Sequence, residues 1–105
     1  MTNYHVLRLF GDGVSRDELD AAVERSRATV EEMRGEGTSI AYLGSDVLDG
    51  SDGLAHGTMC KYDATSEEVV RKHSERAELP LSEVFVPGTP LAGIAPESGV
   101  AMKAA

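Results

Sequence analysis

Two helix-start signals divide this chain and set the order of its elements. SRDE at residues 15–18 and TSEE at residues 65–68 both have the capping-box pattern. In that pattern a Ser or Thr side chain accepts from the amide three residues on, and a Glu carboxylate reaches back. After the first signal, apolar residues recur at steps of three and four to about Arg34, where two glycines end the helix. The second helix is shorter, because Pro80 prevents its continuation.

Four apolar runs surround these helices and are separated by Gly, Asp and Pro residues typical of turns. The expected strands are residues 4–10, 39–48, 54–62 and 82–87, with a hairpin loop at residues 49–53. The order is therefore β-α-β-β-α-β. It predicts an α+β protein with the ferredoxin-like split β-α-β arrangement, in which two helices cover one face of a four-stranded antiparallel sheet.

The length of the chain fits one domain. At 105 residues it can bury one modest core and no second one. Residues 1–87 contain all the periodic segments and form the expected ferredoxin-like domain. Residues 88–105 are a tail rich in Pro, Gly and Ala, with little periodicity.

The expected strands are apolar on both faces. In the first strand, Tyr4, Val6 and Phe10 alternate with Leu7 and Leu9. In an antiparallel sheet with one solvent-exposed face, apolar and polar residues would alternate along each strand. Both faces of this sheet are therefore expected to be covered. We expect a homodimer in which a second copy packs over the face that carries Tyr4, Val6 and Phe10. The alternative is that the tail folds back across that face.

Charge and composition exclude several classes of partner. The chain has 18 acidic and 10 basic residues, a net charge of −8, and no basic stripe for phosphates. No apolar run approaches the roughly 18 to 20 residues that span a bilayer, and the first ten residues lack a signal-peptide pattern. A single cysteine makes no internal disulfide. We therefore expect a cytoplasmic protein that binds neither nucleic acid nor membranes.

The candidate metal ligands are the one cysteine, Cys60, and the three histidines. His56 and Cys60 lie about 13 Å apart along one strand, too far to hold one ion. His5 is a possible cross-strand neighbour of Cys60, because the first strand runs antiparallel beside the third. His73 can approach from the helix layer. The simpler interpretation makes Cys60 a small core residue and the histidines packed or surface residues.

Enzyme motifs are weak. GDG at residues 11–13 lacks the Lys and Ser or Thr of a phosphate-binding loop, so it is interpreted as a turn. The pairs Glu31 with Glu32 and Glu67 with Glu68 are interpreted as solvated helix surface. By analogy of fold, the alternative functions are a dimeric α+β-barrel enzyme or small-molecule-binding protein with a pocket between sheet and helices, or a non-catalytic dimerisation module.

Three stretches carry a resemblance to a known family: YHVLRLF at residues 4–10, AYLGSDV at 41–47, and MCKYDATSEEVVRKHSERAELPLSEV at 59–84. Over residues 4 to about 86 the chain resembles small ferredoxin-like proteins that include a nickel-binding actinobacterial member. This resemblance implies a divalent transition metal such as nickel or zinc as the cofactor.

The most specific part of the resemblance is Cys60-x-Tyr62 at a strand end, followed by a capped helix that carries His73. Together with the expected strand pairing, it makes Cys60, His73 and His5 the candidate metal ligands. Thiolate and imidazole suit nickel, zinc or copper.

The resemblance also assigns family positions to three further residues. It implies an aromatic residue at the position of Tyr42 and a serine at Ser45. The family has an acidic residue in the first strand where this chain has Leu7. That carboxylate is therefore missing from the first strand of this chain.

Overall fold

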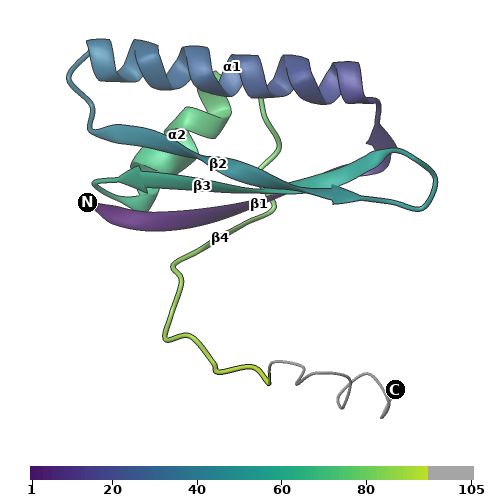
Figure 1. The fold of residues 1–105 in the computed structure, drawn as a ribbon. Helices are drawn as coiled ribbons and strands as arrows, with labels where there is room; N and C mark the ends of the chain where they lie inside the picture. The colour runs from purple at the N-terminus through teal and green to yellow at the C-terminus, as the bar shows by residue number, and fades with distance from the viewer. Residues whose placement is uncertain (95–105) are drawn as a thin grey trace.

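The protein has the predicted order of elements in a computed structural model that describes residues 1–94 (Figure 1). The elements are β1 (Thr2–Val14), α1 (Arg16–Gly35), β2 (Ile40–Asp49), β3 (Ala55–Ala64), α2 (Glu67–Arg76) and β4 (Glu83–Phe85). The strands form one antiparallel sheet in the order β2-β3-β1-β4, and both helices lie on the same face. The ferredoxin-like fold is thus confirmed. Neither helix has the length and hydropathy needed to cross a membrane.

The helix starts follow local side-chain chemistry. At α1 the predicted capping box is present: Ser15 accepts from the Glu18 amide, and the Glu18 carboxylate accepts from the Ser15 amide. At α2 the predicted cap is wrong by one residue. Ser66, and not Thr65, accepts from the Val69 amide at 3.4 Å. The reason is that β3 continues two residues beyond its expected end, which moves the helix start along the chain.

β1 extends beyond its expected end. The prediction of a turn at residues 11–13 is wrong, because β1 continues through them and Val14 pairs with Ala55 of the β2–β3 hairpin. The register shifts between Leu9 and Val14. Gly13 has φ +101°, a backbone conformation that favours glycine, and a Cβ there would lie 2.9 Å from the Leu54 Cβ. The irregular part of β1 between Leu9 and Val14 therefore requires glycine at this position.

The face of the sheet that the helices cover carries Tyr4, Val6 and Arg8, all of them buried. Val6 lies across from Cys60, and Tyr4 lies across from Tyr62. The prediction that Tyr4 and Val6 face a second copy is therefore wrong. Alternation along the strand correctly grouped these residues, but it did not show which group lies under the helices.

The core lies between this covered face and the two helices. Its members come from β1, β2, β3, α1 and α2, so each helix contributes to one continuous cluster. The buried residues are Tyr4, Val6, Val30, Met33, Ile40, Cys60, Tyr62, Ala64 and Val70.

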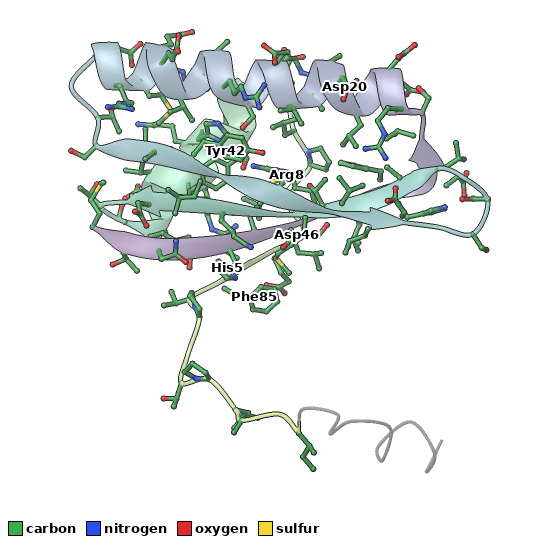
Figure 2. The ribbon with its side chains drawn as sticks, in the orientation of Figure 1. His5, Arg8, Asp20, Tyr42, Asp46 and Phe85 are labelled. Atoms are coloured by element: carbon green, nitrogen blue, oxygen red, sulfur yellow. The ribbon has the colours of Figure 1, made fainter. Side chains whose placement is uncertain are left out.

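The opposite face, here called the open face, includes His5, Leu7, Leu9, Met59 and Phe85 as register partners or neighbours. Figure 2 shows His5, Asp46 and Phe85 on the side of the sheet away from the helices. Leu9 is 52% exposed and Phe85 is 46% exposed. This face is therefore a partly apolar surface without cover from the helices.

The tail does not cover the open face in the part of the chain that the structure describes. Residues 86–94 lead away from the sheet (Figure 1), and Leu91 and Ile94 are almost fully exposed. Residues 95–105, on which the rest of the tail prediction falls, lie outside the described residues. The alternative in which the tail covers the sheet thus has no support from residues 86–94.

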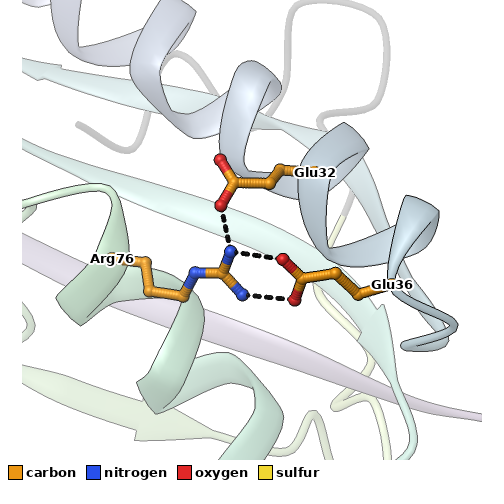
Figure 3. Close-up of polar contacts among 3 residues, drawn as sticks. All are labelled: Glu32, Glu36 and Arg76. Atoms are coloured by element: carbon orange, nitrogen blue, oxygen red, sulfur yellow. Dashed lines mark hydrogen bonds and ion pairs between the residues drawn. The ribbon is translucent and has the colours of Figure 1, made fainter.

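Arg76 connects the two helices on their outer surface (Figure 3). Its guanidinium donates to both carboxylate oxygens of Glu36, at 2.8 Å each, and also to Glu32. Hydrogen bonding to Arg76 lowers the pKa of Glu36. Exposed ion pairs contribute little to stability, so this network mainly orients α2 against the end of α1.

Candidate functional site

A buried arginine is the most unusual feature of the core. Strand alternation directs Arg8 under the helices, where it is 1% exposed. Its Nη1 donates to Ser74 Oγ at 2.9 Å and to the Pro80 carbonyl at 2.8 Å, and its Nη2 donates to Tyr62 Oη at 3.2 Å. Nε has no partner among the described residues. All three partners are uncharged, although a buried charge is costly unless it is paired.

Tyr62 and His73 form a polar link between β3, α1 and α2. Tyr62 Oη lies 2.9 Å from Ser26 Oγ, and the ring centroids of Tyr62 and His73 are 4.8 Å apart. His73 Nε2 lies 3.0 Å from the Ser26 carbonyl, which only accepts, so Nε2 carries a proton and donates it. Burial raises the pKa of Tyr62 and lowers the pKa of His73. His73 is therefore held as a neutral core residue.

This state of His73 predicts how stability depends on pH. Burial lowers the pKa of His73 in the folded state. The unfolded chain therefore binds more protons than the folded chain once the pH falls below about 6.5, the ordinary pKa of histidine. The contribution of His73 is therefore fully present above about pH 6.5 and is lost as pH falls towards the folded-state pKa. We expect a slope of at most about 1.4 kcal/mol per pH unit.

Urea unfolding of the wild type and of His73→Gln at several pH values measures this slope. The variant should lose this part of the pH dependence below about pH 6.5, whereas a matched His56→Gln variant should keep it. Equal slopes in the wild type and His73→Gln would show that His73 does not carry the effect.

A β-bulge in β2 places the hydroxyl group of Ser45 beside Cys60. The register shifts between Tyr42 and Gly44, and Gly44 has φ +118°, which favours glycine. The extra residue turns Ser45 to the same face as Tyr42. Tyr42 Oη lies 2.5 Å from Ser45 Oγ, which donates to Cys60 Sγ at 3.0 Å. A glycine inside a strand pattern is the sequence signal that could have indicated this bulge.

Arg8 and Cys60 line one small cavity between the sheet and α1. Its lining residues include the polar side chains of Arg8, Ser26, Tyr42, Ser45, Thr58 and Cys60, but only apolar atoms face the open space. The other lining residues are apolar and include residues of α1. Figure 2 shows Arg8 and Tyr42 between the sheet and α1. The cavity volume is about 20 Å³, which leaves room for about one water molecule.

The structure does not bring the three predicted metal ligands together. Cys60 is buried on the covered face, and His73 packs on Tyr62 without lining the cavity that contains Cys60. His5 lies across from Lys61 and not from Cys60, so the expected cross-strand contact is absent. Within residues 1–94, no three His, Cys, Asp or Glu side chains gather closely enough to hold a metal ion.

The chemistry of the cavity does not suit a divalent metal ion. Its lining residues carry one thiol, several hydroxyl groups and a buried guanidinium, but no carboxylate, and none of these groups faces the open space. A dication there would meet a like charge at low dielectric constant. A metal site in this protein therefore needs donors from another surface.

The remaining histidine, His56, belongs to the β2–β3 hairpin. Its Nε2 lies 2.8 Å from Asp52 Oδ2 at the molecular surface. Hydrogen bonds from the Leu54 amide and from His56 lower the pKa of Asp52. His56 thus orders a turn, in agreement with its interpretation as a surface residue.

The chain is similar in sequence to one protein family and in fold to a solved structure. A family model described as "Nickel responsive protein SCO4226-like" matches residues 4–86. Among solved structures, that of SCO4226 from Streptomyces coelicolor A3(2) matches with a TM-score of 0.64 and 17% sequence identity. The match covers 88% of this chain and 100% of that chain, and at this identity it shows the fold alone. No curated protein matches the sequence.

Proposed function

The chain belongs to the family of nickel-responsive SCO4226-like proteins, and from this membership we propose that it binds nickel between two copies of itself. The proposed site lies over the open face and uses His5 and Glu83 of each copy. It differs from the set of Cys60, His73 and His5, because His5 lies on the opposite face of the sheet from Cys60 and no cluster of three such side chains forms within residues 1–94. Nickel is the proposed ion, and zinc is the alternative that the same donors suit.

The pairing of β1 with β4 is the observation that carries this proposal. His5 lies across from Phe85, and Leu7 lies across from Glu83, so His5 and Glu83 are diagonal neighbours on the open face. Diagonal neighbours in a sheet are about 7–8 Å apart, within reach of long side chains. Glu83 also supplies a carboxylate beside Leu7, at the place where the resemblance implies an acidic residue.

A second copy would complete the ligand set. One chain offers one imidazole and one carboxylate at this place, whereas a two-fold axis through the open face doubles them to four donors. Leu9, Leu48 and Phe85 are all more than two-fifths exposed on β1, β2 and β4. Burying such apolar side chains favours association of the two faces. Metal binding and dimerisation are therefore proposed to be coupled.

Calorimetric titration of untagged protein with nickel tests the proposal. We expect one ion per two chains, and an affinity about 10- to 100-fold weaker in His5→Ala, because removing one donor disturbs the whole set. Glu83→Gln should weaken binding in the same direction. His56→Ala is the matched control, since His56 lies on the distant hairpin with Asp52.

Two results would contradict this site. Nickel binding that survives in His5→Ala but is lost in Cys60→Ala and His73→Ala would return the site to the sequence-based set. A protein that forms dimers in sedimentation experiments with and without nickel, and never retains metal, would be a dimerisation module instead.

A further inference from the structure

We infer that the C-terminal arm, residues 86–94, crosses to a second copy of the chain and lies on an apolar patch of that copy's open face. The inference rests on the proposed function for one point, the position of the two-fold axis near His5. It goes beyond that function because it names the segment that covers the part of the open face left bare by the second sheet.

The apolar patch consists of Leu9 and Leu48, which converge over Gly57. Both leucines are register partners of Gly57 in the sheet. A Cβ on Gly57 would lie 3.3 Å from Leu9 Cδ2 and 3.3 Å from Leu48 Cδ1, so the two side chains meet above the glycine on the open face. Leu9 is 52% exposed and Leu48 is 41% exposed. This end of the open face therefore offers apolar surface for another chain to bury.

The position of His5 in β1 determines what a second sheet covers. From His5, β1 continues to Val14, which is about 30 Å of extended strand. In the other direction only Thr2–Tyr4 remain, about 10 Å. A two-fold axis at His5 that sets the two β1 strands antiparallel places the long half of each β1 beyond the short end of the other sheet. The patch of Leu9 and Leu48 lies in this overhanging half.

The arm leaves β4 in the direction of the overhang. The register of β4 on β1 runs from Leu7 with Glu83 to His5 with Phe85, so the chain after Phe85 heads towards the short end of its own β1. Figure 1 shows that residues 86–94 leave the sheet on the side away from the helices. An extended arm of this length spans about 30 Å, which matches the overhang of the second copy.

The composition of the arm suits an apolar surface. The chain has a net charge of −8, but VPGTPLAGI at residues 86–94 contains no charged residue, so docking buries no charge. Leu91 and Ile94 are 96% and 97% exposed, so both are available to pack on Leu9 and Leu48. Two prolines restrict the free arm, which lowers the entropy lost on docking. The family model ends at residue 86, so this contact is an addition to the matched region.

Disulfide formation between two variants with an added cysteine tests the inference. Leu91→Cys chains are mixed with isotopically labelled Leu9→Cys chains in the presence of nickel and oxidised, and mass spectrometry measures the mixed covalent dimer. We expect a yield about tenfold or more above that of Leu91→Cys with Glu24→Cys, because docking raises the effective concentration of the two thiols. Glu24 is the control site because it lies on the exposed surface of α1. Wild-type chains control for the buried Cys60.

Three results of this experiment would overturn the inference. Equal yields with Leu9→Cys and Glu24→Cys would show that the arm has no preferred position. A disulfide that forms only within one chain carrying both Leu91→Cys and Leu9→Cys would place the arm on its own sheet. Efficient pairing of Leu9→Cys with itself would set the two β1 strands parallel, which leaves no overhang.

Leu91→Asp separates the arm contact from the nickel site. It should weaken dimerisation about tenfold or more in sedimentation experiments, because a charge replaces a docked apolar side chain, whereas Leu91→Met should keep the affinity. One nickel ion per two chains together with unchanged dimerisation in Leu91→Asp would overturn the arm contact and keep the nickel site. A mixed disulfide dimer that forms equally with a chelator, in a protein that binds no nickel, would support the arm contact and contradict the nickel site.

Discussion

Val6→Lys is expected to unfold the protein. Val6 is 0% exposed and belongs to the core between the sheet and the helices. A lysine there has no acidic partner, and it stands two residues from the charge of Arg8 on the same face. Burying an unpaired charge costs several kcal/mol, against a total stability of about 5–15 kcal/mol for a typical domain. Circular dichroism should show no cooperative thermal transition, or a much lower Tm.

Leu9→Lys is the matched control on the open face. Leu9 is half exposed on the same strand, so the same substitution should leave the fold intact and change stability by only about 0.5 kcal/mol. If two copies associate through the open face, sedimentation should show that this variant is monomeric. A Val6→Lys protein that melts like the wild type would contradict the assignment of the two faces.

The order of elements could be predicted because its signals are local. The Ser15 capping box, the apolar periodicity after it and the glycines near residue 35 each specify a boundary without distant contacts. The hairpin near residues 50–54 is likewise specified by its Gly and Asp content. Where a boundary depended on pairing between strands, as at residues 11–13, prediction from local sequence failed.

The assignment of faces could not be predicted in the same way. Arg8 stands between apolar residues in VLRLF and would ordinarily indicate a solvent-exposed position. Its burial depends on Tyr62, Ser74 and Pro80, all more than fifty residues away in the sequence. No local pattern reveals such partners.

The candidate site could not be predicted from local sequence either, because it depends on the register of β1 against β3. Pairing Val6 with Cys60 puts His5 on the other face, since a shift of one residue reverses every side chain. Cys60 and His73 are both buried, which agrees with the simpler interpretation of them as core residues. The bulge at Gly44 had a local signal, whereas the cavity that it helps to form did not.

Tyr62→Ala is expected to remove about 3–5 kcal/mol of stability. Tyr62 is fully buried at the centre of the polar cluster, with ring centroids 5.3 Å from Tyr42 and 4.8 Å from His73. The Arg8 guanidinium lies 5.9 Å from the centre of its ring. Truncation would leave a large cavity and remove the contacts that connect three elements. Urea unfolding followed by circular dichroism measures the loss.

Tyr62→Phe separates the ring from the hydroxyl group. It keeps the packing but leaves Arg8 Nη2 and Ser26 Oγ without their shared partner, which should cost about 1–3 kcal/mol. In Ser26→Ala, the further loss caused by Tyr62→Phe should be smaller, because one of the two hydrogen bonds is already absent. Equal losses in Tyr62→Phe and Tyr62→Ala would mean that the hydroxyl network, and not ring packing, holds the helices to the sheet.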